Sequence, residues 1–84
     1  MTTESKRELL EARLLEINSA REEVEAAKKM SLADHRTRTR LLSRARDKIA
    51  TVLANPDMLA ELDLDAILTP AVQNLIAAPL AGLA

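Results

Sequence analysis

The residues best suited to chemistry in this 84-residue sequence are cations in its middle third. Four of them follow one another at intervals of four, so a helix would place them along one stripe, which we call the basic stripe: Arg36, Arg40, Arg44 and Lys48. Asp47, three residues after Arg44, would offset part of this charge. Such a stripe could contact an anion, a nucleic acid or an acidic protein, and a solvated helix face without a ligand has the same pattern.

Groups able to carry out catalysis or to bind a metal are scarce. The single histidine, His35, lies beside Arg36, and the absence of Cys excludes thiolate catalysis and disulfide scaffolds. Ser5 and Ser31 stand where they would cap helices rather than act as nucleophiles. The sequence has no Glu-x-x-His pair for a helical di-metal site and no glycine-rich loop for a nucleotide phosphate. We therefore predict that the protein is not an enzyme and has no catalytic residue, metal site or cofactor.

The composition predicts that helices position these cations. Glu, Lys, Arg, Ala and Leu are abundant, the sequence has no glycine before Gly82, and these residues lose little side-chain freedom in a helix. Because the sequence has no aromatic residue, any core must consist of Leu, Ile, Val, Met and Ala. A chain of this length has room for one small domain, which we divide into a helical body, 1–54, and a tail, 55–84.

Residues 5–54 contain two apolar blocks with helical spacing. A capping box formed by Ser5 and Glu8 predicts the start of the first helix. Alternate steps of four and three then define an apolar seam that we interpret as the oligomer seam: Leu10, Leu14, Ile17, Val24, Leu42, Ala45, Ile49 and Val52. Two architectures fit this pattern. One is an antiparallel hairpin with helices over about 5–30 and 32–54, and the other is a single helix over 5–54 in a coiled coil.

The hairpin is the prediction we favour, with a turn near residue 33. Positions 24 and 42, 17 and 49, and 14 and 52 all sum to 66, so these apolar residues would face one another in antiparallel helices. Ser31 and Asp34 form a second capping box where the second helix would begin. Because a two-helix unit has one seam and little else to bury, we predict a homodimer that forms a four-helix bundle. Arg21 lies on the seam either as a buried polar layer or with its stem packed and its head in water.

The tail differs in charge from the segment before it. Residues 31–54 carry a net charge of +4, whereas residues 55–84 carry no cation and four acids. Asn55-Pro56 and Thr69-Pro70 predict the starts of two short helices, about 56–68 and 70–78. The nineteen residues of 66–84, here called the apolar tail, are uncharged and must be covered by the hairpin, a second copy or a partner. The candidate partner-binding residues are Ile67, Leu68, Val72, Leu75, Ile76 and Leu80.

These features predict a non-enzymatic protein–protein interaction module, such as a small helical assembly, chaperone-like or regulatory accessory protein. It would self-associate through the seam and engage another protein through the apolar tail. The alternative is a nucleic-acid-binding regulator that uses the basic stripe. Missing aromatic residues and a low isoelectric point weaken this alternative. A membrane surface could also cover the tail, but the tail lacks the basic flanks that such segments usually have, so this option is not favoured. Because no run of about twenty apolar residues could span a bilayer, we expect a cytoplasmic location.

Overall fold

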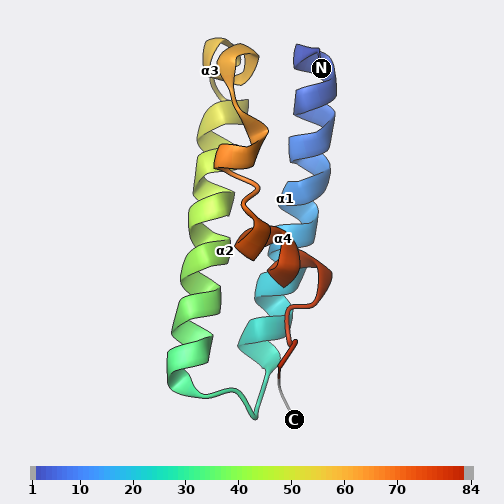
Figure 1. The fold of residues 1–84 in the computed structure, drawn as a ribbon. Helices are drawn as coiled ribbons and strands as arrows, with labels where there is room; N and C mark the ends of the chain where they lie inside the picture. The colour runs from blue at the N-terminus through green and yellow to red at the C-terminus, as the bar shows by residue number, and fades with distance from the viewer. Residues whose placement is uncertain (1, 83–84) are drawn as a thin grey trace.

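The computed structural model describes residues 2–82, which form two long antiparallel helices and three short elements that return along them (Figure 1). Helix α1 spans Thr3–Ala26 and helix α2 spans Leu32–Leu53. Helix α3 follows at Pro56–Glu61, then a 3-10 turn, η1, at Leu64–Ala66, and helix α4 at Pro70–Ala77. The molecule is a rod of 42 × 17 × 17 Å. The all-α class and the hairpin are confirmed, and the continuous helix over 5–54 is wrong.

Side-chain caps determine where the helices begin. The Ser31 hydroxyl accepts a hydrogen bond from the Asp34 amide at 3.1 Å, and Asn55 and Thr69 cap α3 and α4 with a proline directly after each. These three starts agree with the sequence prediction. The predicted box at Ser5 is wrong, because Thr2 Oγ1 accepts from the Ser5 amide and α1 begins at Thr3.

The turn between the long helices needs no glycine. Helix α1 ends at Ala26, earlier than the predicted boundary near residue 30, because Ala27 takes an extended conformation with φ −69° and ψ 122°. No residue other than glycine has a positive φ between positions 2 and 82, so ordinary side chains fit throughout this turn. Met30, at the end of the connection, packs partly buried against the core. The turn therefore forms without glycine because none of its residues requires a positive φ.

The core lies between the hairpin and the returning tail. Its buried side chains are Leu10, Ile17, Ala20, Val24, Leu42, Ala45, Ile49, Val52, Leu59, Ile67, Leu68 and Val72. All predicted seam residues belong to it except Leu14, which is half-buried and packs against it. The seam is thus buried within a single chain, and the tail supplies the cover for which a second copy was expected. The homodimer stays a prediction, and a sedimentation-equilibrium mass of 9.2 kDa would contradict it.

The first short helix is shorter than predicted. Helix α3 ends at Glu61 instead of running to residue 68, because Leu62 is extended with φ −66° and ψ 132°. Asp63 Oδ1 then accepts a hydrogen bond from the Asp65 amide at 3.1 Å and starts η1. An extended residue advances about twice as far as a helical one. This stretch therefore carries Ile67 and Leu68 down the hairpin to the buried positions that they occupy.

Candidate interaction surfaces

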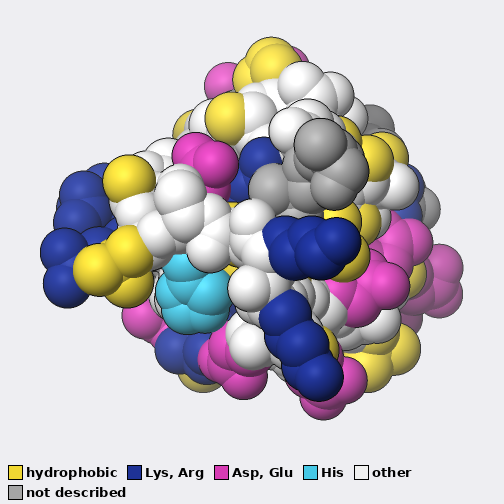
Figure 2. Space-filling view, turned by 90° about the horizontal axis from the view of Figure 1, so that it is seen from below, with side chains coloured by type: hydrophobic (Ala, Val, Ile, Leu, Met, Phe, Trp, Pro, Cys, Tyr) yellow, Lys and Arg dark blue, Asp and Glu magenta, His cyan; other side chains and the backbone are white. Residues whose placement is uncertain are grey.

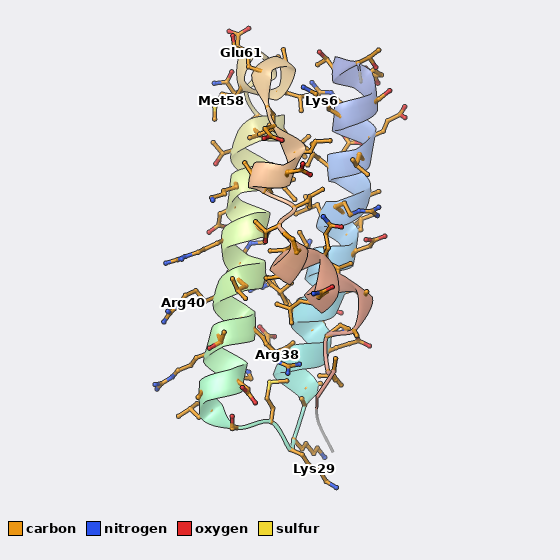
Figure 3. The ribbon with its side chains drawn as sticks, viewed as in Figure 1. Lys6, Lys29, Arg38, Arg40, Met58 and Glu61 are labelled. Carbon is orange, nitrogen blue, oxygen red and sulfur yellow. The ribbon has the colours of Figure 1, made fainter. Side chains whose placement is uncertain are left out.

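The basic stripe runs along the outer face of α2, away from the core. Arg36, Arg40, Arg44 and Lys48 are all exposed. Figure 3 shows Arg40 extending away from the bundle, and the view from the loop end in Figure 2 shows Lys and Arg side chains gathered at the left edge, the α2 side. From Arg36 to Lys48 the helix rises about 18 Å. None of the four residues forms an ion pair with another residue of 2–82.

Asp47 does not pair with the stripe. Its Oδ1 atom accepts hydrogen bonds from Arg46 Nε at 3.2 Å and Nη2 at 3.1 Å, so the pairing expected with Arg44 is not formed. Arg38 of the same helix is also engaged, as described next. Of the six Lys and Arg residues of α2, Arg38 and Arg46 are paired within 2–82, and the four residues of the basic stripe are exposed to solvent.

Two other cations tie the returning segments to the hairpin. Lys6 Nζ donates to the carbonyls of Ala60 and Leu62 at 3.1 and 3.0 Å, at the C-terminal end of α3, where carbonyl groups lack N–H donors from the helix. Arg38 donates from Nη1 to Pro79 O and from Nη2 to Ala81 O, both at 2.7 Å (Figure 3).

Sequence reasoning missed both ties, although a signal was present. Lys6 precedes Leu10 by four residues and Arg38 precedes Leu42 by four, so each cation continues the seam at its polar end. A cation in that position faces whatever covers the seam. The segment that covers Arg38 is uncharged, so its backbone carbonyls are the acceptors that remain there; at Lys6 the acceptors are again backbone carbonyls, although Glu61 lies between them in the sequence.

We expect Arg38→Ala to lower the free energy of unfolding by about 1–2 kcal/mol, because two charge-assisted hydrogen bonds at a partly exposed site are lost. Amides near residues 78–82 should also exchange their hydrogens faster. Arg40→Ala is the matched control, since Arg40 is exposed and unpaired within 2–82. Equal effects of the two substitutions in urea unfolding would contradict the assigned role of Arg38.

The apolar tail is covered by its own hairpin. Ile67, Leu68 and Val72 are buried, Leu75 and Ile76 are half-buried, and Leu80 is 39% exposed. The Gln73 side-chain amide donates to Leu68 O at 2.6 Å and fixes the turn into α4. Of the predicted partner-binding residues, the structure therefore leaves Leu80 as the one that is exposed.

A second surface, the α3 groove, lies where α2, α3 and η1 meet. It is an open apolar cavity of about 290 Å³ lined by Asp47, Lys48, Thr51, Val52, Met58, Leu62 and Ile67. Met58, on α3, is 45% exposed (Figure 3). Lys48 belongs to both the groove and the basic stripe. No spacing rule indicated this groove, because its lining comes from separate elements.

The remaining polar residues singled out in the sequence form no site. Arg21 is half-buried, and its Nε has no hydrogen-bond partner within 2–82, so it builds no polar layer with another side chain there. His35 is half-buried in the first turn of α2. Over the described part of the chain, no three His, Asp or Glu side chains converge as metal ligands would. Within the same part, every helix is too short or too polar to cross a membrane.

The fold defines a small helical hairpin closed by its own C-terminal segment, with the basic stripe and the α3 groove as its candidate surfaces. No protein-family model, curated protein or solved structure matches this chain significantly.

Proposed function

We propose that this chain is a non-enzymatic protein–protein interaction module, a small cytoplasmic accessory protein that binds an acidic segment of another protein through the basic stripe. One observation carries the proposal. Four exposed cations lie in a row on α2 without an ion-pair partner in 2–82, while Arg38 and Arg46 of the same helix are engaged within the fold. None of the four stripe side chains is held in an ion pair within 2–82, so all four are available to a partner.

Burial of the apolar tail moves the proposed partner contact from the tail to α2. Binding a partner through Ile67, Leu68 and Val72 would first require these side chains to leave the core, which costs about 1.5–3 kcal/mol for each. Binding through the stripe requires no rearrangement, because its side chains are already exposed. A rigid helix face that is ready to bind loses less free energy in ordering than a segment that must be released.

The test is a charge reversal on the stripe. Arg40→Glu/Arg44→Glu should weaken binding of a fluorescein-labelled poly-L-glutamate about tenfold, because two attractions of up to about 1 kcal/mol each become repulsions. Lys28→Glu/Lys29→Glu is the matched control: both lysines are exposed, and either double change replaces two cations by two anions and shifts the net charge from −1 to −5. Fluorescence anisotropy at low ionic strength measures both. Equal weakening by the two variants would overturn the proposal.

The competing function, a nucleic-acid-binding regulator, is separated by a second probe. If the stripe served duplex DNA, a short labelled duplex would bind more tightly than poly-L-glutamate. Its log K would then fall with log salt with a slope of about −3 to −4 for four phosphate contacts. We expect the duplex to bind more weakly, because duplex-binding surfaces typically belong to clearly basic domains, whereas this chain has a net charge of −1. Tighter duplex binding would replace the proposed function with its competitor.

A further inference from the structure

The α3 groove separates two surfaces of opposite charge. On one side the basic stripe ends at Lys48, which lines the groove. On the other side α3 and η1 carry exposed acids that form no ion pair within 2–82: Asp57, Glu61, Asp63 and Asp65. Figure 3 shows Met58 and Glu61 on α3 at the end of the rod, and Arg40 farther along the outer side of α2. The cations and the acids therefore follow one another along the rod.

The groove lies on the same face of α2 as the stripe. Thr51, which lines the groove, follows Arg44 by seven residues, close to two helical turns, so both project from one side of the helix. Val52 and Ile67 are buried beneath the groove, whereas Met58 is 45% exposed at its edge. This face thus has an apolar centre, with cations on one side of it and acids on the other.

A face of this kind is complementary to itself. A half-turn about an axis through the groove places the acids of one copy beside the stripe of the other, and the reverse contact forms by symmetry. The same half-turn brings the two grooves together. A flexible methionine side chain at that point can fill an irregular apolar cavity.

We propose that a second copy of this chain covers the α3 groove, in an antiparallel dimer with its two-fold axis beside Met58. Each Met58 packs against the groove of the other copy, and Glu61 and Asp65 of each copy lie beside Arg44 and Lys48 of the other. This dimer differs from the one predicted from the seam, because it leaves the core of each chain intact. It also does not depend on the proposed function.

The dimer should be weak. Overlap of half of the 42 × 17 Å side of the rod would bury about 360 Å² on each copy, below the about 800 Å² of a standard interface. We therefore expect a Kd between about 10 µM and 1 mM. Arg40 and Arg36 lie about 12 and 18 Å before Lys48 along α2, beyond the acids of the other copy, and stay exposed to an acidic partner.

Sedimentation equilibrium over a range of protein concentrations tests the charge pairing. Arg44→Glu/Lys48→Glu and Glu61→Lys/Asp65→Lys should each raise the dimer Kd at least about tenfold, because each change occurs twice in a two-fold dimer. The variant with all four changes exchanges the two signs and keeps the net charge of −1. It should dimerise as the original chain does.

Acids on α1, which contributes no residue to the groove, provide the control for net charge. Glu22→Lys/Glu25→Lys changes two exposed residues and shifts the net charge from −1 to +3, as Glu61→Lys/Asp65→Lys does. Combined with Arg44→Glu/Lys48→Glu it returns the net charge to −1, but it should not restore the dimer. Circular dichroism melting should show that all of these variants remain folded.

The groove is tested separately from the charges. Met58→Glu should weaken the dimer about tenfold, whereas Leu15→Glu, at a residue 72% exposed on α1, should have little effect. A mass of 9.2 kDa at every concentration up to about 1 mM would overturn the proposal. A dimer that the charge reversals leave unchanged would also overturn it, since that dimer would use another surface. These measurements contain no poly-L-glutamate, so failure of the dimer leaves the proposed function to its own test.

Discussion

Leu10→Ala is expected to lower the free energy of unfolding by about 2–5 kcal/mol, whereas Leu15→Ala on the same helix is expected to change it by less than about 0.5 kcal/mol. The two positions differ in burial: Leu10 is 0% exposed and Leu15 is 72% exposed. Both lie within α1, so the small gain in helix propensity from alanine is similar and cancels in the comparison. What remains is the cost of a cavity in a core of aliphatic side chains.

This cost is large for a chain of this length. A domain of 84 residues has a total stability of about 4–13 kcal/mol, so Leu10→Ala removes a large part of it. Urea unfolding followed by circular dichroism measures both variants, with equal slopes against urea as the check for two-state behaviour. An effect of Leu15→Ala as large as that of Leu10→Ala would show that Leu15 is buried in solution. That result would favour the predicted homodimer, with α1 in its interface.

Much of the helical framework could be predicted because its signals are local. The apolar spacing identified the residues that fill the seam, and Ser31, Asn55 and Thr69 each marked a helix start by capping chemistry within three residues of chain. Thr2 and Ser5 are both of residue types that cap helices well, and the sequence does not show at which of them the helix begins. In the structure, Thr2 is the N-cap of α1.

The surface against which the apolar tail packs could not be predicted, because this packing depends on contacts with residues distant in the sequence. Ile67 and Leu68 require burial in any environment. Their spacing in the sequence is the same whether a hairpin, a second copy or a partner buries them. The C-terminal end of α3 followed from this packing, since Leu62 must be extended for Ile67 to reach the hairpin. The α3 groove was equally hidden, because it exists only after Met58 is placed beside α2.

Removal of the apolar tail, by ending the chain after Asp65, is expected to abolish cooperative unfolding. The deletion removes three buried side chains, Ile67, Leu68 and Val72, each stabilising by about 1.5–3 kcal/mol. Their sum of about 5–9 kcal/mol is an upper bound, and it is comparable to the whole stability expected for this domain. The truncated chain would expose the seam residues that the tail covers. Helical signal should fall, and the urea transition should become broad or disappear.

Substitution of two leucines within the tail, one at a time, separates the contribution of core packing to stability from the effect of shortening the chain. Leu68 is 6% exposed and Leu80 is 39% exposed, so Leu68→Ala should cost about 2–5 kcal/mol and Leu80→Ala less than about 1 kcal/mol. If the tail were a free partner-binding element, neither substitution would change the stability of the isolated protein. A truncated chain with an unchanged urea transition would require the same conclusion. The hairpin would then have to bury its seam by another route, and self-association, detected as a concentration-dependent midpoint, is the route that remains.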